Sequence, residues 1–413
     1  MFRRKISLSI LSVLIVLLHG LFFAVAATAI DTENRTVVAT GTIGEGGAEW
    51  TLYDDGVIEV GGGIISHDGA SGSGGSRSYS LWNDYKESIL KIVFTKPVVA
   101  GEELRGLFAR LPYLTYIENM EYIDTSNVVY MTNMFRDASS LTSLDLSNWD
   151  TGNVRYAFMM FLGTSSLTSL DVSNWDTSNM RNINHMFDGT GLIELDLSSW
   201  DTSSVTDMNA TFQHARYLTY LNVSNWDTSN VWRMFSMFRN ASSLTTLDLS
   251  SWDTSSAREM AAMFLGMHSL NILSVGIDFN ITQGTQSISG HGPELPLISK
   301  TNQYTGYWQN LGDGTPENPT GELILTSSQL ISRLTHGRMR ADTWVWQRWS
   351  NRSHMVQSGD TLYELSQRFQ TTVIEFVRLN NIENPNLILV GQVLMIPEPR
   401  IVTVQFYYYD VSE

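Results

Sequence analysis

The sequence predicts an α/β repeat protein in which short strands and short helices alternate and stack into a right-handed solenoid. Three recurring features predict this fold. Tryptophans followed by Asp-Thr recur at intervals of 26, 25, 26 and 26 residues. A phenylalanine series and a leucine series keep the same period. Because one unit of this length cannot bury its apolar face alone, neighbouring units must stack.

The leucines of each unit predict a short strand. In the first clear unit they read Leu141-x-x-Leu144-Asp145-Leu146, which matches the L-x-x-L-x-L template of leucine-rich repeats. The alternation points Leu144 and Leu146 inward and the residue between them outward. The tryptophans of the series are Trp149, Trp175, Trp200, Trp226 and Trp252, and the phenylalanines are Phe135, Phe161, Phe187, Phe212, Phe238 and Phe264.

The second half of each unit has helical spacing. Asp-Thr-Ser-Asn or a close variant supplies side-chain oxygens that can cap a helix. Val128, Met131, Met134 and Phe135 then follow at intervals that place them on one stripe of a helix. We therefore expect one short amphipathic helix per unit.

The aromatic series could line a ligand cleft or fill a shared core. A tryptophan side chain buries about 150–250 Å², and a single unit has nothing else on which to pack it. The sequence favours the core.

Two rows of acidic and amide side chains recur once per unit. The first row faces outward from the strands: Asp145, Asp171, Asp196, Asn222 and Asp248. Its members could bond locally in the turn, form a partner-binding face or hold a divalent cation, and we favour local bonding. The second row is expected at the helix caps: Asp124, Asp150, Asp176, Asp201, Asp227 and Asp253.

The flanking regions read as β-rich caps. Trp50 to Val60 predicts a hairpin with an Asp-Gly turn, and Leu107-Phe108 with Leu114 indicates a degenerate first unit. After residue 275 the period is lost, and two aromatic clusters follow around Trp308 and Trp344. These clusters could bind sugar, but packing is the favoured interpretation.

Composition narrows the function. The formal net charge of -16 makes nucleic acid or an anionic membrane an unfavourable partner, and the absence of cysteine excludes disulfides and thiolate chemistry. Arg3, Arg4 and Lys5 precede an apolar run and two small-x-small patterns, which predict a signal peptide and cleavage near Thr28 or Ile30. The alternative is an uncleaved N-terminal anchor.

The units Leu-Asp-Leu-Ser-x-Trp-Asp-Thr-Ser followed by Met-x-x-Met-Phe resemble the BspA-like leucine-rich repeat surface proteins over about residues 41–347. That resemblance implies a bacterial surface protein that contacts a host or neighbouring cell.

Residues 355–397 are similar to a LysM domain, with a βααβ order. The similarity rests on Val356-Gln-Ser-Gly-Asp-Thr-Leu362 and on Asn384-Pro-Asn-Leu-Ile-Leu-Val-Gly-Gln. It implies binding of N-acetylglucosamine polymers, chiefly peptidoglycan, by two loops. The expected contacts are Gly359, Asp360, Thr361 and Leu362 in one loop and Asn386, Leu387 and Ile388 in the other.

The expected segments are a signal peptide (1–29), an N-terminal cap (30–105), the solenoid (106–275), a C-terminal cap (276–348), a linker (349–354), the LysM-like domain (355–397) and a strand-like tail (398–413). A secreted, wall-associated, adhesin-like binding protein is the function that this order favours.

The rival class is a cell-wall hydrolase targeted by the LysM-like module. No His-Glu-x-x-His, Gly-x-Ser-x-Gly or phosphate-binding loop occurs in the sequence. We expect no catalytic residues, no cofactor and no resident metal, although two carboxylates can suffice for a glycosidase.

Overall fold

The computed structural model describes residues 35–68, 79–281, 292, 294–301, 304–335, 341–348, 353–369 and 371–397. The expected signal peptide, most of the Gly/Ser stretch at 69–80, residues 349–352 of the linker and the tail lie outside the described residues.

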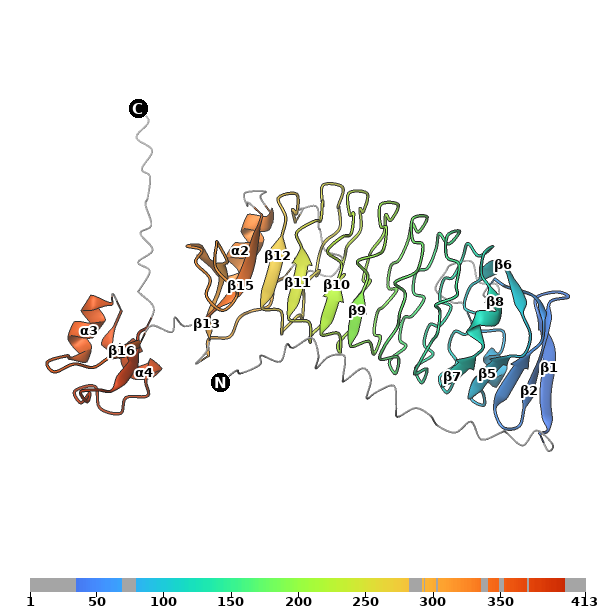
Figure 1. The fold of residues 1–413 in the computed structure, drawn as a ribbon, viewed down its shortest axis with the longest axis horizontal. Helices are drawn as coiled ribbons and strands as arrows, with labels where there is room; N and C mark the ends of the chain where they lie inside the picture. Colours follow the sequence, from blue (N-terminus) through green and yellow to red (C-terminus); the bar gives the residue numbers. More distant parts are fainter. Residues whose placement is uncertain are drawn as a thin grey trace, which may run out of the picture.

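Two sheets form the N-terminal part (Figure 1). The larger sheet has the order β1-β2-β3-β5-β7 and the smaller has β4-β6-β8. Gly56, with φ of 80°, makes the turn of the β2–β3 hairpin, so the predicted hairpin is confirmed. The strands are β1 (Val37–Ile43), β2 (Ala48–Tyr53), β3 (Val57–Val60), β4 (Gly63–His67), β5 (Lys91–Phe94), β6 (Val98–Leu104), β7 (Tyr116–Glu118) and β8 (Ile123–Asp124), with 3-10 turns η2 (Asn83–Tyr85) and η3 (Met120–Tyr122).

The repeats stack side by side, one coil per repeat (Figure 1). We call residues 102–276 the repeat stack. The first coil contributes β7 and β8 to the N-terminal sheets. Strands then recur in the later coils, where Tyr220, Leu221 and Asn222 pair in parallel with Glu194, Leu195 and Asp196. The strands are β9 (Glu194–Asp196), β10 (Tyr220–Asn222), β11 (Thr246–Leu249) and β12 (Ile272–Val275). The same positions in the first two clear units, 144–146 and 170–172, have no strand assignment.

The predicted helices are wrong. Within the described part of the repeat stack there is no α-helix, and the half of each unit that we expected to be helical runs as turns joined by single parallel bridges. The bridges connect Glu103, Tyr130, Tyr156, Asn182, Asp207, Arg233 and Glu259 in succession.

Hydrogen bonding between coils replaces the helix. The N–H groups of Met131, Asn133 and Phe135 donate to carbonyls of the next coil at 2.9, 3.1 and 2.9 Å. Met134 instead donates to the carbonyl of Met131, which closes a tight turn. Asn133 has φ of 57°, in the left-handed region that cannot continue a right-handed helix.

The distance between coils explains this outcome. Stacked phenylalanine rings of neighbouring coils have centroids 5.6–6.2 Å apart. An α-helix with side chains is about 10–12 Å wide, so one helix per coil would force the coils apart. Extended and turn backbone needs only about 4.8 Å between neighbours.

The aromatic series forms a continuous buried core, as predicted. Phe135, Phe161, Phe187, Phe212, Phe238 and Phe264 are all 0% exposed, and the five tryptophans are 0–3% exposed. The indole N–H of Trp200 donates to the Val172 carbonyl at 3.1 Å, and that of Trp226 donates to the Leu197 carbonyl at 3.1 Å. Phe108 stacks on Phe135 at 5.3 Å, so the degenerate first unit joins the same core.

A sheet closes the far end of the stack. Its order is β11-β12-β15-β13-β14, so the last repeat strand pairs directly with the C-terminal part. Trp308 and Trp344 are 0% and 1% exposed, which confirms packing as their role. The elements are β13 (Tyr304–Asn310), β14 (Ile324–Leu325), β15 (Asp342–Arg348) and the helix α2 (Ser327–Thr335), which the sequence did not lead us to expect.

The last described segment is a small βααβ unit with its own core. The elements are β16 (Ser353–Met355), α3 (Leu362–Arg368), α4 (Val373–Leu379) and β17 (Val393–Met395), and the two strands pair antiparallel. Val356, Leu365, Phe376 and Leu394 are buried in this core. No helix of the described residues has the length and apolar content needed to cross a membrane.

Candidate functional sites

The first loop of the βααβ unit leads from β16 into α3. Thr361 is the N-cap of α3, and its hydroxyl accepts a hydrogen bond from the Glu364 N–H at 3.2 Å. Gly359 is exposed with φ of 97°, and no atom lies within 4 Å of the position that a Cβ would occupy there. The Gly359 backbone is therefore open to a ligand.

Asp360 of the same loop is occupied by internal bonds. Its carboxylate accepts hydrogen bonds from the Gln357 N–H at 2.7 Å and from the His354 ring at 2.6 Å. The bond from the Gln357 N–H, with that from His354, lowers the pKa of Asp360. Asp360 therefore organises the loop, whatever it contributes to sugar binding.

The prediction that Leu362 contacts sugar is wrong. Its side chain is 2% exposed and belongs to the core of the βααβ unit, so it cannot cover a sugar face. A helix N1 leucine directly after a capping threonine can face inward, and the motif alone does not reveal which way it points.

The second loop precedes β17. The Asn386 N–H donates to the side-chain oxygen of Asn384 at 3.0 Å, and Asn386 is exposed. Leu387 is 62% exposed, whereas Ile388 is partly buried against the core. Leu389 and Val390, which we did not single out, are 64% and 71% exposed. The loop thus offers an amide and exposed aliphatic groups together.

The outward row on the repeat stack makes the local bonds that we favoured. The carboxylate of Asp145 accepts from both the N–H and the hydroxyl of Ser147, at 3.1 and 2.7 Å. Those bonds lower the pKa of Asp145. The N–H groups of Ser173, Ser198, Ser224 and Ser250 donate in the same way to Asp171, Asp196, Asn222 and Asp248.

The second row caps turns and not helices, because no helix follows it. Asp201 accepts from the N–H and hydroxyl of Ser203 at 3.0 and 2.6 Å. The threonine after each aspartate links coils, since the Thr202 hydroxyl donates to the Asp227 carbonyl at 2.9 Å. Thr125, Thr151, Thr177 and Thr228 make the equivalent bond. Asp-Thr-Ser is therefore a structural signature of the coil.

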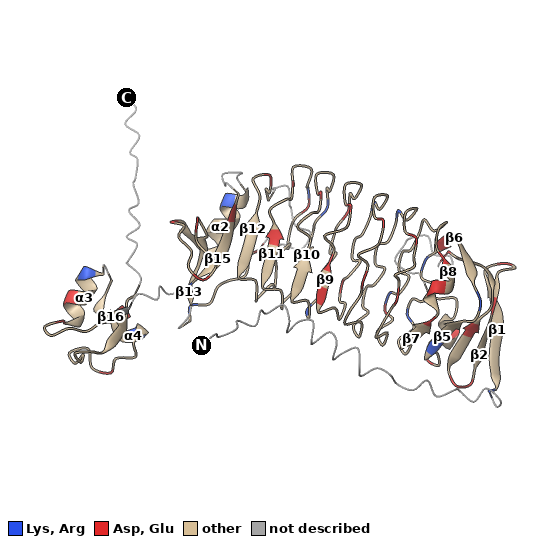
Figure 2. Cartoon of the chain, viewed as in Figure 1, with Lys and Arg blue, Asp and Glu red and all other residues tan. Residues whose placement is uncertain are grey.

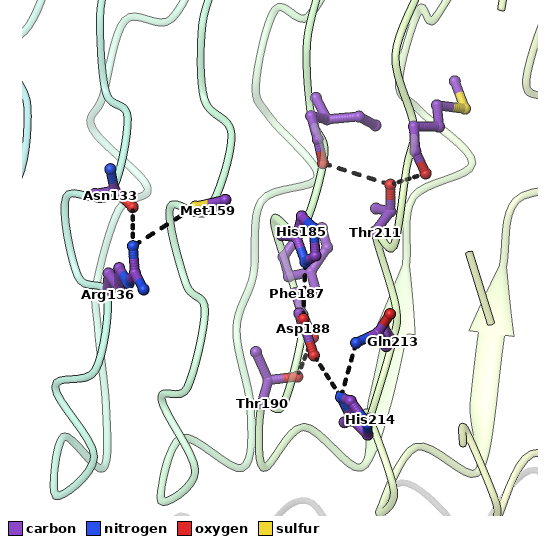
Figure 3. A network of polar contacts seen from close by, with 12 residues as sticks. Asn133, Arg136, Met159, His185, Phe187, Asp188, Thr190, Thr211, Gln213 and His214 are labelled. Carbon is purple, nitrogen blue, oxygen red and sulfur yellow. Dashed lines mark hydrogen bonds and ion pairs between the residues drawn. The ribbon is translucent and has the colours of Figure 1, made fainter. Parts of the chain in front are cut away.

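Two imidazoles from neighbouring coils lie close to one carboxylate (Figure 3). The Nδ1 atoms of His185 and His214 lie 2.8 and 3.1 Å from different oxygens of Asp188, which is 8% exposed. The Gln213 amide nitrogen lies 3.1 Å from the same Nδ1 of His214. The cluster ties neighbouring coils together. Among the described residues, no group of three His, Asp or Glu side chains is placed to hold a metal ion.

Acidic residues are spread along the coils and both ends of the repeat stack (Figure 2). Their number, 42 Asp and Glu against 26 Lys and Arg, gives the whole chain an anionic exterior. Ile193 and Tyr217, which lie shortly before β9 and β10, and Tyr220 at the start of β10 are also exposed. The repeat pattern did not reveal them because these positions vary between units.

Two family models match separate parts of the chain, the repeat stack and the βααβ unit. A model described as "Mycoplasma protein of unknown function, DUF285" matches residues 102–190 and 160–276. The LysM domain model matches residues 354–397.

Three curated proteins are similar over short stretches. N-acetylmuramoyl-L-alanine amidase XlyA of Bacillus subtilis is 45% identical over 49 residues, 12% of this chain and 16% of the amidase. Secreted LysM effector ELP2 of Colletotrichum higginsianum is 43% identical over 42 residues, 10% of this chain and 24% of the effector. Secreted LysM effector ECP6 of Passalora fulva is 41% identical over 49 residues, 12% of this chain and 22% of the effector. The chain thus spans at most about a quarter of the length of these relatives.

Two solved structures are similar at low TM-scores. A leucine-rich repeat protein from Eubacterium ventriosum has a TM-score of 0.26 and 12% identity, with 62% of this chain and 93% of that chain covered. A leucine-rich cell surface protein from Faecalibacterium prausnitzii has a TM-score of 0.19 and 11% identity, with 61% and 92% covered. The family matches show that residues 102–276 are a BspA-like repeat region of the DUF285 family and that residues 354–397 are a LysM domain.

Proposed function

We propose that this chain is a secreted binding protein that its LysM domain retains on peptidoglycan, while the repeat stack is displayed as an adhesin-like surface. The observation that carries the proposal is the LysM domain itself, with two loops that leave the Gly359 backbone and the Asn386 and Leu387 side chains open. Open amide and aliphatic groups suit the N-acetyl group and the apolar face of a sugar.

We also propose that the repeat stack is one continuous, right-handed solenoid. The parallel bridges from Glu103 to Glu259 support its continuity, and its right-handed sense remains a prediction. The segment boundaries given above, the signal peptide and a wall-associated location belong to the proposal as well. Sequencing the N-terminus of mature protein tests cleavage near Thr28 or Ile30.

Binding, and not catalysis, is the activity that we propose. The similarity to the amidase covers only 16% of that enzyme, so it does not bring an amidase activity to this chain. The outward row from Asp145 to Asp248 is proposed only as part of a partner face, because its carboxylates already make turn bonds. Release of soluble fragments from purified walls would contradict the proposal.

Substitution of Leu387 tests the sugar site. Leu387 is 62% exposed in the proposed loop, and Ile374 is an equally apolar side chain that is 77% exposed on α4. Because both side chains are exposed, Leu387→Ala and Ile374→Ala should leave the fold intact. We expect Leu387→Ala to reduce sedimentation with peptidoglycan about fivefold or more, in line with about 1 kcal/mol or more for a buried contact. Ile374→Ala should sediment like the unmodified chain, and equal sedimentation of both variants would refute the site.

A further inference from the structure

One corner of the repeat stack carries cationic and aromatic side chains that the LysM-based proposal does not use. It consists of the two residues that follow a buried aliphatic or methionine position in each coil. We call it the corner surface, and its residues are Val129-Tyr130, Arg155-Tyr156, Arg181-Asn182, Thr206-Asp207, Trp232-Arg233 and Arg258-Glu259.

The backbone holds these residues in register from coil to coil. The Arg181 N–H donates to the Arg155 carbonyl at 2.9 Å, and the Arg258 N–H donates to the Trp232 carbonyl at 2.9 Å. The Thr206 backbone lies between these residues: its N–H donates to the Arg181 carbonyl, and its carbonyl accepts from the Trp232 N–H, both at 3.0 Å. Side chains at the first position of each pair therefore project at regular intervals of one coil.

The arginines at this first position are available to a partner. Arg155, Arg181 and Arg258 are exposed, and none of them forms an ion pair within the part of the chain that the structure describes. The acids of the corner surface are already engaged, since Arg233 lies 3.4 Å from the Asp207 carboxylate and 3.0 Å from that of Glu259. In a chain with 42 acidic side chains, the corner surface therefore carries three exposed arginines with no carboxylate partner among the described residues.

Aromatic faces lie among the arginines. Trp232 is 41% exposed and borders an open hollow of about 640 Å³, which is also lined by Ser255, Ser256 and Arg258. Tyr130 and Tyr156 are half-buried and stack at 5.1 Å with an interplanar angle of 6°. Arginine guanidinium groups form bidentate pairs with acid groups. An exposed aromatic side chain offers a flat apolar surface on which a sugar ring can lie.

We propose that the corner surface binds a linear anionic polysaccharide. The acid groups of the polysaccharide pair with Arg155, Arg181 and Arg258, and one of its sugar rings lies on Trp232. The spacing of one or more coils between cations suits a chain ligand that runs along the stack. Recognition of acid groups by arginines differs from the N-acetyl and hydroxyl contacts expected at the LysM domain, so we expect the two sites to act separately.

Binding of the full chain to immobilised polygalacturonate tests this assignment. We expect saturable binding that weakens as salt rises, because exposed ion pairs are screened. Arg155→Ala with Arg181→Ala should weaken binding about tenfold. The matched control is Lys96→Ala with Arg216→Ala, which removes the same charge at exposed positions elsewhere and should leave binding unchanged.

Two further measurements make the result specific. Trp232→Ala should weaken binding to polygalacturonate but not to inorganic polyphosphate, which has no ring to stack. Chitin pull-down should stay intact in every variant, which separates a lost corner surface from a lost LysM domain or a lost fold. Absence of polygalacturonate binding, equal loss in the control pair, or a Trp232 variant that binds both polymers as before would overturn the proposal.

Discussion

Individual residues of the repeat act mainly by joining one coil to the next. The Trp200 indole is 3% exposed and stacks between Trp175 and Trp226 at centroid distances of 6.1 and 6.4 Å. The Thr202 hydroxyl bonds to the following coil, and the Asp201 carboxylate bonds within its own turn. The sequence predicted the buried tryptophans, because period and size leave few other places for them. It did not reveal the threonine bond, since a hydroxyl can cap a turn or bridge coils equally well.

Truncation of one core tryptophan should therefore destabilise its neighbours. We expect Trp200→Ala to lower the free energy of unfolding by about 3–5 kcal/mol, as for other large aromatic truncations. Denaturant unfolding measures this change. Tyr217→Ala, at a side chain that is 64% exposed, should stay within about 0.5 kcal/mol. Equal stability of the two variants would show that the tryptophan ladder is not a core.

The aspartates of the outward row give stability a predictable pH dependence. Serine hydroxyl and N–H donors lower the pKa values of Asp145, Asp171 and Asp196 below their ordinary 3.8 in the folded chain. A carboxyl with a depressed folded pKa stabilises the fold above its unfolded pKa, and this contribution is lost as pH falls through the folded value. Stability should therefore fall below about pH 4.

Replacement of these three aspartates by asparagine tests the cause. Asparagine keeps the acceptor oxygen, as Asn222 does naturally by accepting from Ser224 at 3.3 and 2.8 Å, but it does not titrate. The triple variant should show a flatter fall of the denaturation midpoint between about pH 5 and pH 3. An unchanged profile would assign the acid sensitivity to other groups.

At the level of elements, the same spacing of apolar residues is compatible with a helix and with a backbone of turns. Val128, Met131, Met134 and Phe135 are all 0% exposed, so the predicted inward stripe is correct although the helix is not. Periodicity identifies which side chains face inward, but it does not specify whether N–H groups bond within the coil or between coils. The left-handed residue two positions before each phenylalanine decides this, and His185 and Ala210 at that position give no sequence signal.

Removal of one complete coil should be tolerated. Deletion of residues 177–201 joins Asp176 to Thr202 and preserves the Asp-Thr junction and the spacing of 26 residues between tryptophans. Because each coil contacts only its neighbours, the shortened chain should fold with cooperative unfolding and a moderately lower midpoint.

Deletion of residues 177–188 is the matched control, since it joins Asp176 to Gly189 out of phase. We expect this variant to lose cooperative unfolding, which circular dichroism during heating measures. Equal tolerance of both deletions would contradict a core built on phase.

At the scale of the whole molecule, the described residues form two separate hydrophobic cores. One core runs from Ile43 to Trp344, and the other is confined to residues 356–396 of the LysM domain. The order of β-rich cap, repeats, closing cap and LysM domain could be predicted from motifs that recur or resemble known families. The inward side chain of Leu362 and the cationic corner surface could not, because both depend on which way a side chain points after folding.

The measurement that tests the central claim most directly is sedimentation with purified peptidoglycan of three proteins: the full chain, a truncation after residue 352, and the fragment 353–399. The truncation keeps the larger core intact, so near-ultraviolet circular dichroism should show a folded repeat stack. We predict that the full chain and the fragment sediment and that the truncation stays in solution. Sedimentation of the truncation to the same extent as the full chain would place wall binding in the repeat stack and contradict the assignment of roles.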